Sequence, residues 1–490
     1  MLENKPLSRG RVIVAEGKIQ HPSVAERKAR GKGSRDTTPL ADHDGWSPAA
    51  DRPDPVALLE EQDATREKDL VPVRHGRMMV SPFTFYRGAA KIMAADLKDT
   101  PRAGLNAQLC GDAHLSNFGL FASPERQLLF DVNDFDETLP GPFEYDVQRM
   151  SASFTIAGRN NGFTKAETRA ATLSSVRAYR EAMAEFAAMR TMDVWYAHLS
   201  EQDVLAALKN LVRTTTGKNK KALKKGEKKA RAVAAKAHTR DSLQALSKLA
   251  ELVDGKYQII SQPPIVVPLK DLPAAAEMTP DQVRHVIHEQ FRSYRNTLQN
   301  DRRHLLERFE IIDVARKVVG VGSVGTRAFI VLLQGRDEQD PLFLQVKEAT
   351  TSVLEDHLPK SRFKQPGERV VHGQRLMQAA SDIYLGWTKG VEDGRYLYWL
   401  QLRDMKGSAV IETMPPSSLE VYSHLCGWTL ARAHARSGDS VAIAAYLGKS
   451  DAFDRSISDF SERYADQNEQ DYEAFVKAVR SGRLEAVEGV

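Results

Sequence analysis

The sequence of 490 residues is poor in cysteine, with only Cys110 and Cys426, and it has no uninterrupted apolar run of about 18 residues. Two cysteines are too few for a disulfide framework or a cysteine-rich zinc site. Without a long apolar run, no segment is expected to span a bilayer. The N-terminus also lacks the apolar stretch and small-residue cleavage site of a signal peptide. These absences predict a cytoplasmic protein without a membrane partner.

A large excess of one charge sign is also missing, because the net charge is only +4. The whole molecule is therefore not expected to be a dedicated nucleic-acid binder. Positive charge is concentrated in an insertion at residues 214–240, where lysines and arginines alternate with alanines. We interpret the insertion as a solvated helix. Contact with nucleic acid or another polyanion is the alternative.

The length allows roughly two to four domain-sized units, because single cores stop growing near about 250 to 300 residues. Segments with helical spacing surround a block rich in Val, Leu, Ile and Phe, which predicts an α+β fold. Gly, Ser, Pro and charge dominate the start, so order is expected to begin near Val56. The predicted units are a flexible arm at 1–54, a helical unit at 55–315, a β-rich unit at 316–405 and C-terminal helices at 406–490.

The densest polar chemistry lies in two short segments joined by a predicted hairpin. Asp112 and Asn117 are five residues apart, and Asp134 follows two short strands around the turn at 123–125. Phosphoryl transfer needs a carboxylate beside the acceptor hydroxyl and oxygen ligands that hold Mg²⁺. We predict that Asp112 serves the acceptor and that Asn117 and Asp134 bind the metal.

Two other interpretations of these acids exist. They could form an exposed acidic loop, with His114 a satisfied core histidine and Asp136 and Glu137 solvated turn residues. Gly-Asp-x-His also opens the motif set of two-metal phosphoesterases. The further Gly-Asp and Gly-Asn-His elements of that set do not follow in this sequence.

A second motif, G-x-G-x-x-G, comprises Gly320, Gly322 and Gly325 and includes Ser323. A dinucleotide-binding loop would be followed by a helix, but residues 326–333 have the pattern of a strand. A Gly-Lys-Ser/Thr sequence is also missing, which excludes a P-loop. The pattern favours a glycine flap between two strands that covers ATP phosphates. An ordinary tight hairpin is the alternative.

The next strand, at 342–347, ends in Lys347. In a flap architecture this lysine would reach the α and β phosphates of ATP. It would need a carboxylate partner, for which Glu355 and Glu368 are both candidates. A strand-end lysine in solvent is the alternative.

The two polar segments, residues 111–117 and 133–137, resemble the catalytic and metal-binding segments of aminoglycoside phosphotransferases and their kinase-like relatives. Over about residues 50–480 the chain is also similar to a bacterial family classed as a domain of unknown function. The first resemblance implies ATP and Mg²⁺ as cofactors. It matches Asp112 to the catalytic Asp, Asn117 and Asp134 to the metal ligands, Lys347 to the phosphate-binding Lys, and Gly320, Gly322 and Gly325 to the flap.

The order of these parts departs from ordinary kinases, because the glycine motif follows the catalytic segment by about 200 residues. A circular permutation would explain this order. Residues 316–405 would form the nucleotide lobe and hinge, and the predicted helix at 419–435 would lead into the catalytic loop. The resemblance thus implies a protein-kinase-like, two-lobed fold in permuted order. Ser437-Gly438-Asp439, a competing loop, lacks an Asn five residues after the Asp.

The sequence therefore predicts an ATP- and Mg²⁺-dependent phosphotransferase acting on a small-molecule or protein hydroxyl. A nucleotide-binding pseudokinase or scaffold and a nucleotidyl transferase remain alternatives. Four basic residues could line an anion pocket or form structural ion pairs: Arg74, His75, Arg77 and Arg87.

Overall fold

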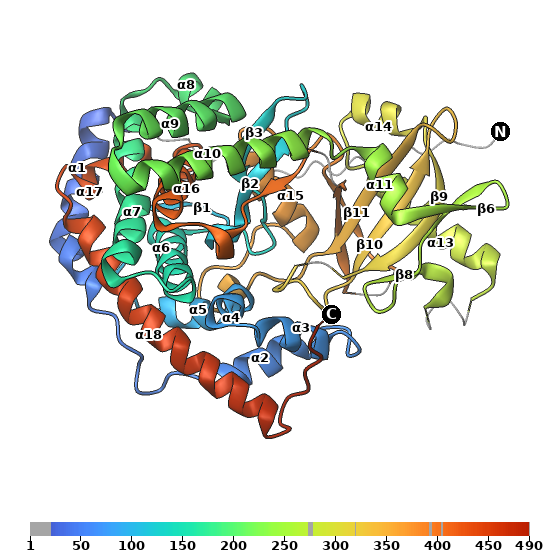
Figure 1. The fold of residues 1–490 in the computed structure, drawn as a ribbon, viewed down its shortest axis with the longest axis horizontal. Helices are drawn as coiled ribbons and strands as arrows, with labels where there is room; N and C mark the ends of the chain where they lie inside the picture. The colour runs from blue at the N-terminus through green and yellow to red at the C-terminus, as the bar shows by residue number, and fades with distance from the viewer. Residues whose placement is uncertain (1–20, 273–277, 319, 392–393, 403–404, 490) are drawn as a thin grey trace, which may run out of the picture.

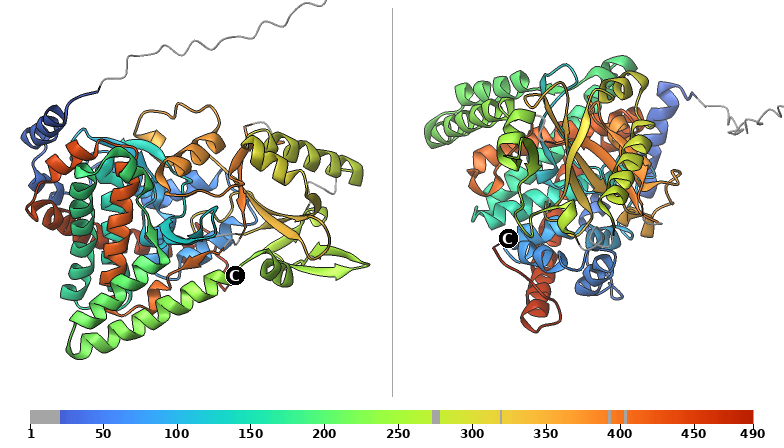
Figure 2. Two further views of the ribbon diagram at one scale, coloured as in Figure 1. Left: turned by 90° about the horizontal axis from the view of Figure 1, so that it is seen from above. Right: turned by 90° about the vertical axis from the view of Figure 1, so that its right-hand side faces the viewer.

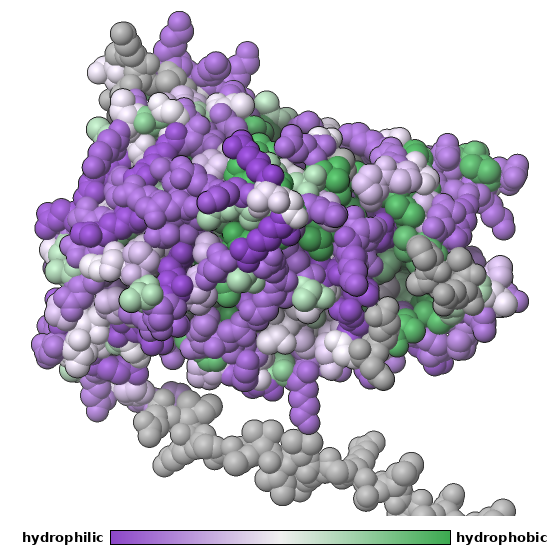
Figure 3. Space-filling model, turned by 90° about the horizontal axis from the view of Figure 1, so that it is seen from below, coloured by the Kyte–Doolittle hydropathy of each residue, from purple (hydrophilic) through white to green (hydrophobic). Residues whose placement is uncertain are grey.

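The computed structural model describes residues 21–272, 278–318, 320–391, 394–402 and 405–489 (Figure 1). A helix-rich region and a sheet-rich region lie side by side, which confirms a mixed α and β fold. In the part of the chain described, no helix is both long and apolar enough to cross a membrane. Seen from below, the surface is mostly hydrophilic, with hydrophobic residues in separate patches (Figure 3).

In the described part of the chain, regular structure begins at Val24, well before the position near Val56 that the sequence predicted. Helix α1 (Val24–Thr37) packs against α17 (Ser440–Leu447). Arg27 and Arg30 pair with Asp439 at 2.7 and 2.9 Å. Asp439, from the competing loop, thus anchors α1 and also caps α17. The prediction of a flexible arm to residue 54 was wrong here because these partners are distant in sequence; its first 20 residues lie outside the described part.

Long helices form the core of the helical region. Helix α6 (Phe143–Asn160) is buried along nearly its whole length and packs against α7 (Lys165–Ala188) and α18 (Ala452–Arg480). Helix α16 (Pro416–Ala435) crosses α7 closely, because a Cβ on Gly427 would lie 2.1 Å from the Ser175 carbonyl oxygen. Shorter helices complete this region: α2 (Pro55–Asp63), α3 (Val71–Met78), α4 (Pro82–Gly88), α5 (Ala90–Leu97), α8 (Thr191–Tyr196) and α9 (Glu201–Thr214).

The basic insertion forms helix α10 (Gly217–His238), as predicted. It runs along the outside of the molecule from the helical region toward the sheet region (Figure 2). Short 3₁₀ turns occur at η1 (Leu40–Asp44), η2 (Leu115–Asn117), η3 (Leu269–Asp271), η4 (Val353–Asp356) and η5 (Ile411–Thr413).

The predicted hairpin is confirmed as β2 (Phe118–Ala122) and β3 (Leu128–Val132), with Phe118 opposite Val132. Strands β14 (Gly407–Ser408) and β5 (Leu199–Ser200) extend it to the order β14-β2-β3-β5. Beside it, β1 (Asn106–Leu109) pairs antiparallel with β4 (Leu139–Pro142). The segments before and after the hairpin therefore return to the same edge.

The sheet region is a six-stranded antiparallel sheet of order β12-β13-β11-β10-β9-β8. Alternate residues of β10 enter two apolar clusters, Val331 and Leu333 on one face and Ile330 and Leu332 on the other. Both faces are thus buried. The strands are β8 (Val266–Pro268), β9 (Glu310–Lys317), β10 (Ala328–Gln334), β11 (Pro341–Glu348), β12 (Gly386–Lys389) and β13 (Tyr396–Gln401).

Helices α13 (Pro280–Arg295) and α14 (Asn300–Leu306) contribute to the first cluster. Helix α11 (Ser242–Leu249) and the hairpin of β6 (Ala250–Val253) and β7 (Lys256–Ile259) contribute to the second. The sequence pattern around 368–380 predicts a helix, and α15 (Pro366–Met377) lies close to that position.

Two boundaries in this region differ from the prediction. The β-rich unit was placed at 316–405, but β8 and most of β9 precede residue 316. Helical spacing over 241–253 predicts a single helix, but α11 ends at Leu249, and Asp254 and Gly255, with positive φ values of 48° and 75°, turn the chain from β6 into β7. An Asp-Gly pair between strands is a hairpin signal that helical periodicity obscured.

Candidate active site between the two regions

The loop between β1 and β2 is held in place by an aspartate of α6. Asp146 accepts hydrogen bonds from the backbone nitrogens of Cys110, at 2.8 Å, and Gly111, at 3.0 Å. Gly111 has a φ of 82°, and a Cβ there would lie 2.3 Å from the Glu137 carbonyl oxygen. Only glycine fits this position. The Gly-Asp sequence thus fixes the direction in which Asp112 leaves the backbone.

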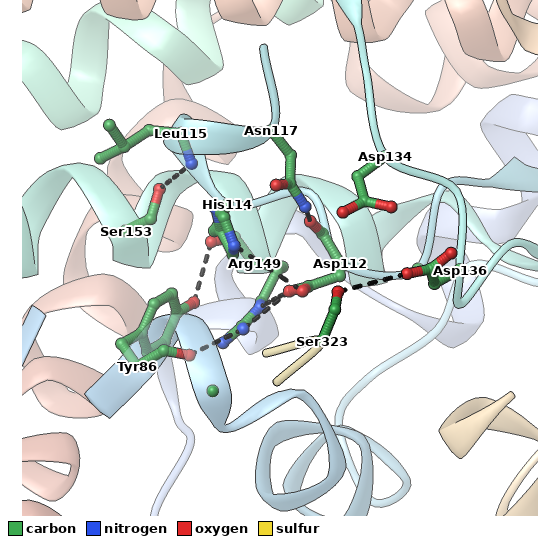
Figure 4. A network of polar contacts seen from close by, with 12 residues as sticks. Tyr86, Asp112, His114, Leu115, Asn117, Asp134, Asp136, Arg149, Ser153 and Ser323 are labelled. Carbon is green, nitrogen blue, oxygen red and sulfur yellow. Dashed lines mark hydrogen bonds and ion pairs between the residues drawn. The ribbon is translucent and has the colours of Figure 1, made fainter. Parts of the chain in front are cut away.

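Asp112 pairs with Arg149, which lies one turn after Asp146 on α6 (Figure 4). Arg149 Nε and Nη2 lie 2.8 and 2.7 Å from Asp112 Oδ1. Arg149 also donates to the Tyr86 carbonyl oxygen and lies 3.9 Å above the Tyr86 ring. Burial raises the pKa of Asp112, but the charge and hydrogen bond of Arg149, together with the other basic neighbours, outweigh burial and hold the pKa below its ordinary value. Asp112 is therefore ionised at neutral pH and weakly basic.

Asn117 and His114 flank this carboxylate. Asn117 Nδ2 donates to the Asp112 carbonyl oxygen at 2.7 Å, which leaves Asn117 Oδ1 as the acceptor or ligand. His114 is buried, with Nε2 3.7 Å from Asp112 Oδ2. Its Nδ1 has no hydrogen-bond partner among the described residues. Burial lowers the pKa of His114 to about 3, so the ring is neutral at pH 7. His114 is a core histidine, but not a fully satisfied one.

The acids after β3 meet the lysine at the end of β11. Lys347 Nζ lies 2.9 Å from Asp136 Oδ2 and 3.4 Å from Asp134 Oδ1. Tyr398, opposite Lys347 in the β11–β13 ladder, donates a hydrogen bond to Asp136 Oδ1. The Glu137 carboxylate accepts a hydrogen bond from the backbone of η4. Lys347 is therefore not a solvent-facing lysine, and Asp136 and Glu137 are not solvated turn residues.

Neither glutamate predicted as the partner of Lys347 contacts it. Glu355 accepts hydrogen bonds from the backbone nitrogens of Ser352 and Ser361. Glu368 lies 3.9 Å from His372 on α15. The acids that replace them stand 213 and 211 residues away from the lysine in the chain. The prediction was wrong because both candidate glutamates follow the lysine in sequence, whereas its actual partners, Asp134 and Asp136, precede it.

Two acids of this group, Asp134 and Glu137, are incompletely neutralised, and burial raises the pKa of Glu137 to about 7. The Asp134 side chain lines the cavity between the two regions and is 37% exposed. Burial and the charge of Asp136 raise the pKa of Asp134 to about 6, and Lys347 offsets only part of this effect. Added positive charge would stabilise such a carboxylate. Asp134 is thus suited to hold a cation.

The glycine motif forms the loop between β9 and β10, as predicted. Gly320 and Gly325 have φ values of 68° and 88°, which favour glycine. Arg77 donates to the Gly320 carbonyl oxygen at 2.5 Å, and the Glu67 backbone nitrogen donates to that of Gly325 at 2.8 Å. The segment around α3 therefore fastens the loop at both ends.

The middle of the glycine loop passes directly over the acids and α4. Ser323 Oγ lies 3.5 Å from Asp136 Oδ2. A Cβ on Gly322 would lie 3.1 Å from the Arg87 carbonyl oxygen. The loop in this conformation closes onto the helical region.

Both halves of the predicted site line one cavity of about 130 Å³. Segments that are about 200 residues apart in sequence therefore converge here. Lys347 stands behind the acids and does not line the cavity itself. The lining includes Arg66, Arg87, Asp112, His114, Asn117, Asp134, Asp136, Glu137, Gly320, Gly322 and Ser323.

Two arginines stand in the same cavity as the acids. Arg87 Nε and Arg66 Nε are buried and have no hydrogen-bond partner in the described residues. Burial lowers the pKa of Arg87, and burial with a neighbouring arginine lowers that of Arg66 to about 9. Arg66 Nε nevertheless lies 3.4 Å from Asp63, which also pairs with Arg74 and His75 at 2.7 and 2.8 Å, and these last two have structural roles. Of the basic residues singled out from the sequence, Arg87 is the one in the cavity lining.

A family model described as an uncharacterized protein conserved in bacteria, DUF2252, matches residues 66–478. The chain belongs to the DUF2252 family. No curated protein and no solved structure matches it. The matched residues of this DUF2252 chain include Asp112, Asn117, Asp134, the glycine loop and Lys347.

The cavity of the DUF2252 chain offers few protein ligands for a metal ion. Among the residues described, no group of three or more His, Cys, Asp or Glu side chains is arranged to hold a metal. Mg²⁺ in phosphoryl-transfer sites commonly uses one or two carboxylates, with water and phosphate as the other ligands. Asp134 and Asn117 could supply the protein ligands. Arg87 and Arg66 provide positive charge for the accompanying anion.

The size of this DUF2252 cavity limits what it encloses. Small-molecule sites usually measure about 300–1,000 Å³, against about 130 Å³ here. The cavity has room for reacting groups and a cation. A complete nucleotide would extend beyond it or displace the fastened glycine loop.

Three residues that support the site, Asp146, Arg149 and Tyr398, were not predicted from the sequence. A signal existed for the first two, because they are charged residues three apart in a helix that is otherwise mostly apolar on its buried faces. Charged residues at such positions are rarely buried without a partner. Tyr398 gave no local signal, since its role comes from its place opposite Lys347 in the sheet.

Proposed function

We propose that the protein is an ATP- and Mg²⁺-dependent phosphotransferase that transfers a phosphoryl group to a hydroxyl of a small molecule or a protein. We also propose that it has a kinase-like, two-lobed arrangement in permuted order. The main support is the single cavity shared by Asp112, Asn117, Asp134 and the glycine loop. Strands β9–β11 would hold the nucleotide, and the helical region would hold the acceptor.

In this proposal Asp112 orients the acceptor hydroxyl through Oδ2, because Oδ1 is engaged by Arg149. Its low pKa makes it a weak base. Phosphoryl transfer through a loose transition state depends mainly on positioning and charge neutralisation. A weakly basic but firmly placed carboxylate is adequate for that task.

Asp134 and Asn117 would hold Mg²⁺, which would neutralise charge on the transferred phosphoryl group. Lys347 would exchange part of its contact with Asp134 and Asp136 for the nucleotide phosphates. Arg87, whose Nε has no partner among the described residues, would bind a further anionic oxygen.

A nucleotide-binding pseudokinase is the second candidate. The fastened glycine loop and the small cavity favour it, because both oppose a productive nucleotide complex. A fold of this kind could bind nucleotide slowly and act as a scaffold without turnover.

Titration calorimetry of the full chain with ATP, in Mg²⁺ and then in EDTA, tests the shared premise of both candidates. We expect Mg²⁺-dependent binding that Asp134→Asn weakens about 100-fold and that the exposed control Asp281→Asn retains. Absence of such binding would exclude both candidates.

Long incubation with ATP then separates the alternatives by product. ADP supports phosphotransfer, and bound but unconsumed ATP supports the pseudokinase. AMP with pyrophosphate would instead indicate nucleotidyl transfer on the same scaffold.

A further inference from the structure

A second cavity, of about 380 Å³, lies between the β2–β3 hairpin and helices α9, α10 and α16. It shares no lining residue with the cavity that holds Asp112. Its walls are predominantly apolar. They include Leu120, Phe130, Val204, Leu208, Val233 and Leu425.

The second cavity is partly open to solvent, so a ligand can enter it. Its volume falls within the range of about 300–1,000 Å³ that is usual for ligand sites. Such sites are mostly apolar with a few placed polar groups, which matches this composition. The cavity therefore has the size and lining of a binding site for an apolar molecule.

The polar groups of this cavity indicate the charge of that molecule. Ser418 Oγ, from α16, is buried without a hydrogen-bond partner in the described residues and lines the cavity. Lys229 and Lys236 line it from α10 and are exposed to solvent, and the acid in its lining, Glu201, is paired with His238 at 2.7 Å. Residues 217–238 of α10 contain nine lysines and arginines and a single acid, Glu227. An apolar interior thus opens beside a strongly positive helix.

We propose that this cavity binds a single acyl chain with an anionic head, such as a fatty acid. The chain would lie against Phe130 and Leu425, and the head would lie beside Lys229 and Lys236. Charge complementarity selects an anionic head over a neutral or cationic one. A purely polyanionic partner of α10 would use the lysines but would leave the apolar cavity unexplained.

Tyr422 joins this cavity to the loop that carries Asn117. It lines the cavity, and its hydroxyl donates a hydrogen bond shared between the carbonyl oxygens of Leu115, at 2.8 Å, and Phe118, at 3.0 Å. A bound chain should therefore reduce amide hydrogen exchange in residues 115–120. Unchanged exchange there at saturation would overturn the assignment of the ligand to this cavity.

Titration calorimetry with dodecanoate, below its micelle-forming concentration, tests the proposal directly on the full chain. We expect saturable binding to one site. Dodecyltrimethylammonium, which has the same chain and the opposite charge, should bind at least tenfold more weakly. Absence of saturable dodecanoate binding, or equal binding of the two amphiphiles, would overturn the proposal.

Two alanines of α10 provide a matched pair of variants. Ala230 lines the cavity, whereas Ala235 is exposed and outside the lining. Ala230→Trp should fill the cavity and weaken dodecanoate binding at least tenfold, while Ala235→Trp should bind normally. Circular dichroism checks that both variants keep their helices. Equal binding by both folded variants would place the ligand elsewhere.

The charge of the head is tested separately. Lys236→Glu should weaken dodecanoate binding by several-fold, whereas Lys228→Glu, outside the lining, should have a smaller effect. Equal effects would contradict a specific contact. Sedimentation analysis tests whether a second copy of the chain occupies the cavity instead. A dimer that Ala230→Trp dissociates, in a protein that binds no amphiphile, would assign the cavity to that second copy and overturn the proposal.

Discussion

Two aspartates at the end of β3 are only three residues apart in sequence but lie in very different surroundings. Asp131 and Arg432 form an ion pair in which each side chain is only 1% exposed, and Asp131 also accepts a hydrogen bond from the Ala379 backbone. Asp134 is 37% exposed and lies 3.4 Å from Lys347. Asp131 is fully satisfied and fastens the hairpin to α16. Asp134 is left short of positive charge and faces the cavity.

Both residues are aspartates, so the positively charged partner, and not the residue type, decides which acid is structural and which is a candidate site residue. Removing the partner of a fully buried charge should cost stability. Removing an under-neutralised acid should cost binding instead. Variants at the two positions therefore test whether Asp131 is structural and Asp134 functional.

The largest effect is expected for Asp131→Asn. It leaves the Arg432 guanidinium buried without a counter-charge, so the free energy of unfolding should fall by about 3–5 kcal/mol. Urea denaturation followed by circular dichroism measures this change. A loss below about 1 kcal/mol would show that Asp131 is not the structural member of the pair.

Asp134→Asn should behave in the opposite way. The free energy of unfolding should stay the same or rise slightly, because one of two neighbouring negative charges is removed. Affinity for ATP in Mg²⁺ should fall about 100-fold, or about 2.7 kcal/mol. Strong destabilisation with normal ATP affinity would reverse the roles that we assign.

The pH dependence of cation binding should be the next largest effect. The pKa of Asp134 is raised to about 6 from its model-peptide value of 3.8, so its carboxyl is protonated below about pH 6 and cannot bind a cation. Mn²⁺ affinity in the presence of ATP should be about tenfold lower at pH 5 than at pH 7.5. Electron paramagnetic resonance of free Mn²⁺ measures this, and Asp134→Asn should lack the response.

The same raised pKa predicts a stability change without the cation. The folded state holds its proton up to about pH 6, whereas the unfolded chain releases it near pH 3.8. This group alone therefore makes the protein less stable as the pH rises from about 4 to 6. Comparing the urea midpoints of the native chain and Asp134→Asn across that interval isolates its contribution.

The smallest effect is expected for the fastened loop. Arg77→Gln removes a charged donor from the Gly320 carbonyl oxygen. A loss of about 1 kcal/mol should speed amide exchange in the loop about fivefold. Hydrogen exchange measured by mass spectrometry over residues 320–326 tests this, with Arg463→Gln on the exposed side of α18 as the control. Unchanged exchange would mean that the other contacts hold the loop alone.

Local patterns predicted much of the secondary structure on which the site is built. The hairpin β2–β3 followed from two apolar runs around Ser123-Pro124-Glu125, and the glycine loop followed from strand patterns on both sides. Helices α15 and α16 were also predicted close to their observed positions. Each of these features depends on residues within about ten positions of one another.

Features that depend on distant partners were not predicted. Helix α1 needs Asp439, and Lys347 takes its acids from across the chain. Arg149 acquires its role only when α6 packs beneath the loop of Asp112. The start of the sheet was misplaced because β8 and β9 are identified by their pairing with β10 and each other.

The features that could be predicted from the sequence are those that depend on residues close together in the chain. These features are the turns, the strands, the Gly-Asp motif and the glycine motif. They depend on backbone freedom and on neighbouring residues, and both can be read from the sequence. Tertiary structure alone decided that Asp134 faces a cavity while Asp131 is sealed against Arg432. Partner and solvent exposure set the energy of a charge, and chain packing fixes both.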